Sequence, residues 1–306
     1  MNARKQFSMI GWALCAFYLV STAGQLLLGI TMQQFGRWLP DGMWSEDFLM
    51  ISSLVIMYGI GFPVFLLIVK RLPSWYKEER KSISPGILLT VFVVCLGAAY
   101  IGNMIGTAMM MFGNLFFGIQ SLNPVTDTFL NMTPEVMLWT TVIAAPIMEE
   151  LMFRKILIDR LIPMGQKQAV LFSGLVFALF HGNFYQFFYA WGLGMIFAYL
   201  YSYTGKLRYS VLMHMGINFV GGMLPFLLER WAGTHFLGAW LLSLLLGGLS
   251  LTAMIASIAL TVIFFGRVTW YPAWKKPERG VCYAVFTASG VWAFLLICAV
   301  EFMQMF

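Results

Sequence analysis

The sequence predicts an all-α fold, a polytopic transmembrane helical bundle of about eight to nine spans. Sixty per cent of its 306 residues are hydrophobic and only 10% are charged, whereas soluble domains carry about 25% charged residues. Apolar runs recur along the chain, and a helix needs about 20 apolar residues to cross a bilayer. No polar stretch is long enough to fold separately, so we expect a single membrane domain over residues 1–306.

Nine apolar runs are candidate spans by this length criterion. They lie near residues 9–33, 48–69, 86–118, 136–158, 168–182, 185–203, 208–228, 236–266 and 282–305. The third and eighth are long for one crossing. The fifth is short, and its end at His181-Gly182-Asn183 is typical of a helix stop.

The basic residues are distributed unevenly among the loops between these runs. With the N-terminus inside, the inner loops receive sixteen of the 19 Lys and Arg residues, and the outer loops are mainly acidic. This asymmetry predicts a multi-pass protein of the cell membrane with a cytoplasmic N-terminus and an odd number of spans. The excess of basic over acidic residues is therefore explained by orientation in the lipid bilayer, and we expect no nucleic-acid partner.

One apolar run, APIMEELMFRKIL at residues 144–156, carries ionisable side chains. Such groups are costly in hydrocarbon, so they indicate a functional site. Glu150 and Arg154 are four residues apart and can form an ion pair on one helix face. Glu149 points about 100° away from Glu150. We therefore interpret Glu150 and Arg154 as structural support and Glu149 as a candidate general base.

Two later runs carry further polar groups, His181 in FALFHGNF and His214 with Asn218 in VLMHMGINF. A single histidine in a span can also be a hydrogen-bond partner in helix packing. We nevertheless expect the three runs to converge on one hydrolytic site. There Glu149 takes a proton from water, His181 orients that water, and His214 and Asn218 donate hydrogen bonds to the oxyanion.

A zinc site would use the same residues in another way. Two histidines and one glutamate, here His181, His214 and Glu149, are a known type of catalytic zinc ligand set. The HExxH helix that makes zinc more specific is missing. We therefore rank water activation without a required cofactor first and keep zinc as the alternative.

The polar residues form three motifs in order along the chain. They are EExxxR at Glu149–Arg154, FxxxH at Phe177–His181 and HxxxN at His214–Asn218. On successive hydrophobic helices they resemble the CPBP family of intramembrane endopeptidases, which includes the CAAX prenyl proteases and the bacterial Abi proteins. The resemblance covers roughly residues 135–224, under a third of the chain.

The resemblance implies a four-helix catalytic core at residues 135–228, between N-terminal spans in 1–134 and C-terminal spans in 229–306. It implies a cavity open toward the cytosolic side. It also implies that Glu149 and His181 activate water, and that His214 and Asn218 form the oxyanion site. Glu150 and Arg154 then support the site, which agrees with their spacing.

The sequence thus predicts an intramembrane protease, glutamic-type or metal-dependent, that hydrolyses membrane-associated protein or peptide substrates. The alternative is a non-proteolytic membrane scaffold or bacteriocin-immunity protein of the same family. A small-molecule transporter has the weakest support, because no internal repeat is evident. The sequence specifies neither the substrate nor the oligomeric state.

Overall fold

The computed structural model describes residues 2–35, 38, 45–75, 80–118, 131–233, 235–275, 277 and 279–305. Every regular element within these residues is helical. The predicted all-α, polytopic class is therefore confirmed. The division of the chain into a catalytic core with flanking spans stays a prediction.

The helices follow one another as long single elements or as composite ones. The N-terminal part contains α1 (Ala3–Phe35), α2 (Glu46–Leu54) continuing into α3 (Phe62–Val69), and α4 (Pro85–Phe117). The central part contains α6 (Pro134–Met137), α7 (Ala145–Glu149), α8 (Leu157–Leu161), α9 (Gln166–Phe180), α10 (Phe184–Thr204) and α11 (Leu207–Asn218). The rest contains α12 (Leu224–Ala232), α13 (Phe236–Phe265), α14 (Gly280–Phe286) and α15 (Ser289–Met303).

In the described part of the chain, fewer helices meet the length and hydropathy criteria for crossing a membrane than the eight to nine spans predicted. Among the described residues, six helices are long and apolar enough to cross a membrane, or seven if the pair α14–α15, bent by 61°, is one span. The two predicted spans at 168–182 and 185–203 do not qualify. Helix α9 has only 15 residues, and α10 carries five tyrosines that lower its hydropathy. The two helices pack against each other, and the number of candidate spans is odd when the pair α14–α15 is one span.

Several spans are interrupted by π-helical turns, and three of these end two residues before a proline. They are Val55–Gly61 before Pro63, Leu138–Ala144 before Pro146, and Phe219–Met223 before Pro225. Proline has no N–H and its ring clashes with the carbonyl four residues earlier, so the wider turn relieves a local conflict. A fourth π-helical turn, Glu150–Ile156, follows α7. Such turns are frequent at functional sites.

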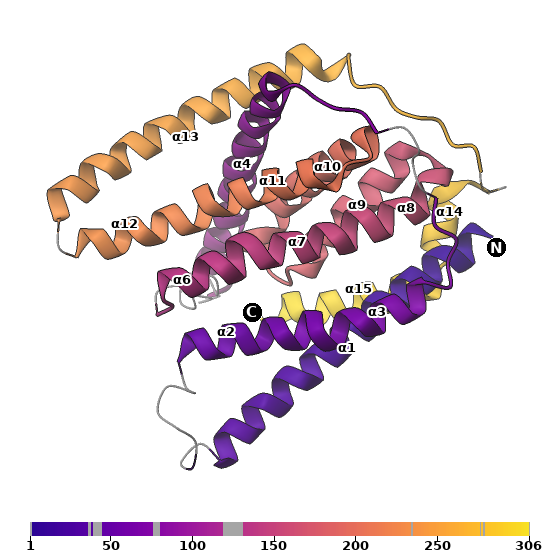
Figure 1. Cartoon of the computed structure of the whole chain (residues 1–306), viewed down its shortest axis with the longest axis horizontal. Helices are drawn as coiled ribbons and strands as arrows, with labels where there is room; N and C mark the ends of the chain where they lie inside the picture. The colour runs from indigo at the N-terminus through magenta and orange to yellow at the C-terminus, as the bar shows by residue number, and fades with distance from the viewer. Residues whose placement is uncertain are drawn as a thin grey trace.

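The central helices lie between two outer groups (Figure 1). Helices α12 and α13 run side by side on one side, with α4 packed against α13. Helices α1, α3 and α15 pack together on the other side. The largest buried cluster joins this second group to α9 and α10 and includes Phe153 and Phe177. The polar motifs therefore lie at the middle of the bundle.

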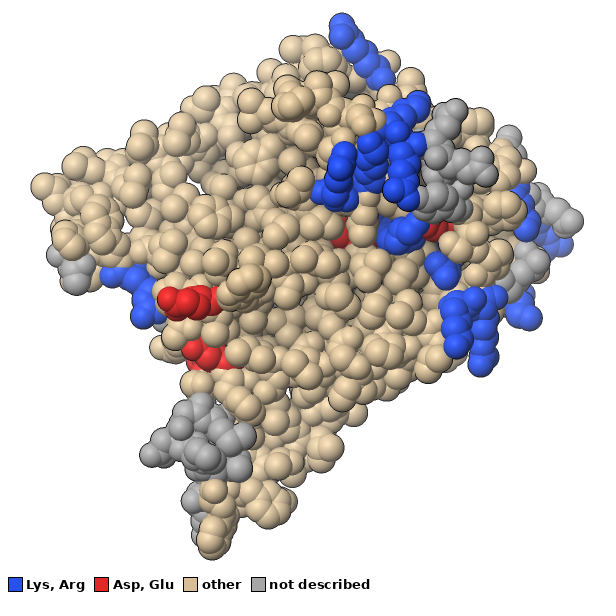
Figure 2. Space-filling model, viewed as in Figure 1, with Lys and Arg blue, Asp and Glu red and all other residues tan. Residues whose placement is uncertain are grey.

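Basic residues gather at the end of the bundle where the chain begins (Figure 2). The start of α1, the end of α8, the α10–α11 connection and the α13–α14 connection meet at this end (Figure 1). We call it the basic end. Lys77 and Lys276, which the sequence assigns to inner loops, lie outside the described residues.

Candidate active site

The two adjacent glutamates lie in different surroundings. Glu150 and Arg154 are fully buried, and Arg154 Nε lies 3.1 Å from Glu150 Oε2. The predicted ion pair is therefore confirmed. The side chain of Glu149 keeps 18% of its surface exposed, because the helix rotation turns it toward a cavity.

Aromatic rings enclose the buried guanidinium of Arg154. Its Cζ lies 4.3 Å from the ring centre of Phe177 and 5.7 Å from that of Phe197. Ring faces attract a cation, and this attraction is stronger when the pair is removed from water. Phe177 of the FxxxH motif thus helps to stabilise the buried charge of Arg154 in the EExxxR motif. The sequence alone does not reveal this contact, because the two motifs are far apart along the chain.

His214 connects the two glutamates. Its Nδ1 donates a hydrogen bond of 3.1 Å to Glu150 Oε1, and its Nε2 lies 3.6 Å from Glu149 Oε2. The imidazole is stacked on Phe197 and meets Phe177 edge-on. These contacts fix the orientation of a side chain that is 5% exposed. The sequence places His214 in the site but does not reveal this bridge.

Glu149 has no partner on its own helix, as predicted, but it has neighbours from other helices. Besides His214, the hydroxyl of Tyr58 lies within hydrogen-bonding reach of its carboxylate. Tyr58 comes from the π-helical turn Val55–Gly61. Sequence reasoning missed Tyr58 because tyrosine in an apolar span is common and because this span lies outside the three motifs.

His181 lies at the tip of the α9–α10 hairpin. Its Nδ1 donates a hydrogen bond of 2.8 Å to the Phe177 carbonyl, which leaves Nε2 as an acceptor. Gly182 follows with φ +65°, a left-handed conformation that favours glycine. Asn183 Oδ1 then accepts from the Gln186 N–H at 2.9 Å and caps α10. The predicted helix stop is confirmed.

Asn218 ends α11, one helical turn after His214. Its Nδ2 donates a hydrogen bond of 2.9 Å to the Thr141 carbonyl. An amide NH2 group carries two hydrogens, so one remains for another acceptor. The bond to Thr141 fixes the amide against the helix that carries Glu149.

The four predicted catalytic residues share one cavity of about 510 Å3. Glu149, His181, His214 and Asn218 all line it, whereas Glu150 and Arg154 lie beneath its surface. Besides Thr141, further polar lining residues come from α4, α10 and α12 and were not predicted: Tyr100, Asn103, Tyr185, Gln186, Tyr189 and Glu229. Asn103 could have been selected from the sequence, because a carboxamide inside an apolar span is uncommon.

The cavity extends away from the basic end. Glu229 belongs to its lining and lies 22 residues beyond the start of α11, a helical path of about 33 Å at 1.5 Å per residue. This distance is close to the thickness of the hydrocarbon core. The cavity thus reaches toward the end of the bundle opposite the basic end. The cytosolic opening implied by the resemblance and the cytosolic basic end implied by the charge distribution both stay predictions.

The metal alternative finds little support in the arrangement of donors. Among the described residues, no group of three or more His, Cys, Asp or Glu side chains is placed to hold a metal ion. His181 Nδ1 is bound to a backbone carbonyl and His214 Nδ1 to a carboxylate, bonds that metal-binding histidines also make while they ligate through Nε2. The choice between water activation alone and zinc therefore stays a prediction.

The comparisons with known proteins concern the central part of the chain. A family model described as "Type II CAAX prenyl endopeptidase Rce1-like" matches residues 131–220. No curated protein and no solved structure matches the chain. The matched segment runs from α6 to the end of α11 and contains all three motifs. Residues 131–220 are thus similar to the Rce1-like family of CAAX prenyl endopeptidases.

Proposed function

We propose that this protein is an intramembrane endopeptidase of the glutamic type, acting on membrane-associated protein or peptide substrates. One observation carries the proposal. Glu149 and His214 lie 3.6 Å apart on the wall of a cavity that His181 and Asn218 also line. A base, a water-orienting group and two hydrogen-bond donors are the groups that amide hydrolysis requires.

The first step forms a tetrahedral intermediate. The carboxylate of Glu149 takes a proton from water, and the water oxygen bonds to the carbonyl carbon of the substrate. The electron pair of the C=O bond moves to oxygen, which becomes an oxyanion. Asn218 Nδ2 and His214 Nε2 donate hydrogen bonds to it. His181 orients the water through Nε2, since its Nδ1 is bound to the Phe177 carbonyl.

The second step breaks the C–N bond. The oxyanion re-forms the carbonyl, and the peptide nitrogen leaves with the proton that Glu149 took from water. Glu149 is thereby returned to its carboxylate form. Acid and base roles thus alternate on one side chain, with no covalent bond between enzyme and substrate.

In its role toward the oxyanion, His214 donates at both ring nitrogens, with Nδ1–H bonded to Glu150 Oε1 and Nε2–H directed to the oxyanion.

The proposed reaction needs no metal. Metal analysis of purified, active protein tests this point: we expect less than one metal ion per ten chains at full activity. Zinc bound at one ion per chain, removed by a chelator together with the activity and restored with it, would overturn the metal-free mechanism.

The decisive experiment compares two glutamates of the same span. We expect Glu149→Gln to lower the cleavage rate of a membrane-associated peptide by about 10²- to 10⁴-fold, the usual contribution of a general base. Glu135→Gln, at the exposed start of α6, is the control and keeps the rate. Full cleavage by the Glu149→Gln variant would rule out the proposal. If the wild type cleaves no peptide while a Glu149/His214 double variant keeps cellular activity, the scaffold alternative is supported.

We further propose that the basic end lies in the cytoplasm, because sixteen of 19 basic residues belong to loops on that side. The Glu229 end of the cavity then faces outward. In a variant with its native cysteines replaced by alanine, a membrane-impermeant maleimide added to intact cells should modify Glu229→Cys and leave Lys5→Cys unmodified. The reverse labelling would overturn this orientation and restore a cytosolic cavity.

A further inference from the structure

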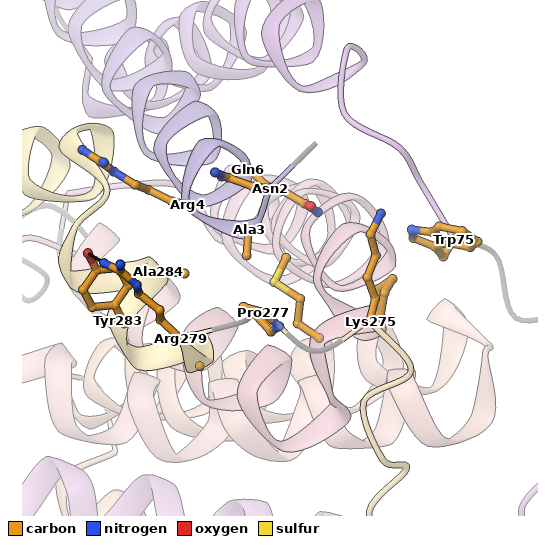
Figure 3. A pocket seen from close by; sticks show the side chains of 13 residues that line it. Asn2, Ala3, Arg4, Gln6, Trp75, Lys275, Pro277, Arg279, Tyr283 and Ala284 are labelled. Carbon is orange, nitrogen blue, oxygen red and sulfur yellow. Dashed lines mark hydrogen bonds between the residues drawn. The ribbon is translucent and has the colours of Figure 1, made fainter.

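A second cavity, of about 540 Å3, lies at the basic end of the bundle (Figure 3). Four parts of the chain form it: the start of α1, Trp75 after α3, Pro163 and Met164 after α8, and a last part with Lys275, Pro277, Arg279, Gly280, Tyr283 and Ala284. These segments meet where several helices leave the apolar part of the bundle. We call it the basic-end cavity. It shares no lining residue with the cavity that contains Glu149.

Three cationic side chains line the basic-end cavity. Arg4 comes from α1, and Lys275 and Arg279 come from the segment before α14. None of the described lining residues is acidic. Like charges repel one another, so an anion near these three side chains lowers the energy of the arrangement. The charge of the described lining therefore favours a negatively charged ligand.

Two of the cations are held in place by neighbouring groups. Arg4 Nε donates a hydrogen bond of 2.9 Å to the Thr287 carbonyl. One terminal nitrogen of Arg279 donates a hydrogen bond of 2.9 Å to the Tyr283 hydroxyl. Each guanidinium has further N–H groups, and its planar fork matches phosphate oxygens. Fixing the side chains beforehand reduces the entropy that binding costs.

The remaining lining is apolar or amphipathic. Ala3, Pro163, Met164 and Ala284 contribute carbon surface, and Trp75 and Tyr283 contribute rings with a polar edge. Figure 3 shows Arg4 and Arg279 near one end of the cavity and Lys275 and Trp75 near the other. A ligand with a charged head and a carbon-rich body fits this mixture better than a small inorganic anion. Trp and Tyr are also typical of the membrane–water interface.

We propose that the basic-end cavity binds the phosphate-containing headgroup of an anionic phospholipid from the adjoining leaflet. Basic pockets between transmembrane helices at this side of a membrane are suited to such headgroups. The site is separate from the proposed proteolytic reaction, and its test needs no substrate.

Bound lipid would also stabilise the helix that carries Glu149. The backbone N–H groups of Trp274 and Lys275 both donate to the Pro163 carbonyl, at 3.2 and 2.9 Å. Pro163 lies just after α8, in the same composite span as Glu149. A headgroup held by Lys275 therefore restrains the end of this span, and a ligand that binds only the folded state raises the unfolding temperature.

The experiment measures thermal unfolding of the full chain in a neutral detergent with added lipid. We expect phosphatidylglycerol to raise the unfolding temperature by several degrees and phosphatidylcholine, whose headgroup is zwitterionic, to have no such effect. Inorganic phosphate at the same concentration tests whether the ligand is a soluble phosphate, and we expect it to leave the unfolding temperature unchanged. An equal shift with phosphatidylcholine or with inorganic phosphate would overturn the lipid assignment.

Two triple variants with the same loss of charge locate the site. Arg4→Gln/Lys275→Gln/Arg279→Gln removes the cations of the cavity. The control, Lys5→Gln/Lys70→Gln/Arg71→Gln, removes three exposed cations of the same end that do not line it. We expect the first to lose the response to phosphatidylglycerol and the second to keep it. Equal loss in both would show a diffuse surface effect and overturn the site.

A variant with one substitution tests the site without the risk that three substitutions together disturb folding. Lys275→Gln changes one exposed side chain and should weaken the apparent affinity for phosphatidylglycerol about tenfold, as expected for one lost charge-assisted contact. Lys5→Gln is its matched control and should bind as the wild type does. Unchanged binding by Lys275→Gln would contradict the proposal.

Discussion

The cavity-facing and core-facing sides of one helix differ sharply around residues 149–154. Both sides carry a glutamate, and the two glutamates are neighbours in sequence. Glu150 faces the core, where it contacts Arg154 at 3.1 Å and accepts from His214 at 3.1 Å. Glu149 faces a cavity of about 510 Å3 and keeps part of its surface exposed.

The difference follows from helix rotation and from the aromatic rings around Arg154. A rotation of about 100° per residue separates neighbouring side chains, so only one of them can reach the enclosed guanidinium. The buried carboxylate is neutralised and fixed, and the exposed one remains available to a substrate. The same carboxylate group thus has a structural role in Glu150 and a proposed catalytic role in Glu149.

The largest effect on stability should come from Glu150→Ala. This change leaves Arg154 as an uncompensated buried cation, which typically costs about 3–5 kcal/mol. Glu149→Ala, the same substitution one residue earlier, should cost less, because Arg154 keeps Glu150 as its partner and the Glu149 side chain is partly exposed. Unfolding in detergent with increasing denaturant measures both. Equal destabilisation would remove the contrast between the two sides.

A smaller effect on the free energy of unfolding should come from the interaction between Glu150 and His214. Because His214 Nδ1 bonds Glu150, we expect His214→Ala and Glu150→Ala to be non-additive by about 2 kcal/mol in a double-mutant cycle of unfolding. The pair His214→Ala and Glu135→Ala is the control and should be additive, because the two residues belong to different spans and Glu135 is exposed. Additivity in both cycles would mean that the histidine bridge contributes no stability.

The smallest stability effect, and a specific effect on activity, should come from Gly182→Ala. Gly182 and Gly118 have φ values of +65° and +66°, so alanine at either position should cost about 1 kcal/mol. Gly182 follows His181, and a Cβ there would also lie 3.4 Å from Glu301 Cβ, whereas Gly118 has no neighbour within 4 Å. We expect lower cleavage activity only for Gly182→Ala. Equal activities would show that the turn does not position His181.

Sequence patterns determined much of the candidate site before any packing was known. Helical spacing alone paired Glu150 with Arg154, because residues four apart on a helix are always neighbours. The apolar runs gave the helical class, and His181-Gly182-Asn183 gave a helix end. The three motifs also selected the residues that line one cavity.

Other features depended on the tertiary structure. The bridge from His214 to both glutamates joins residues more than 60 positions apart, and no local rule specifies such a contact. The contribution of Tyr58, the extent of the cavity toward Glu229 and the placement of Arg4, Lys275 and Arg279 around one cavity have the same origin. Local spacing is fixed by backbone geometry, whereas these contacts depend on how separate helices pack. The sequence by itself therefore determined which residues could act, and packing decided which of them meet.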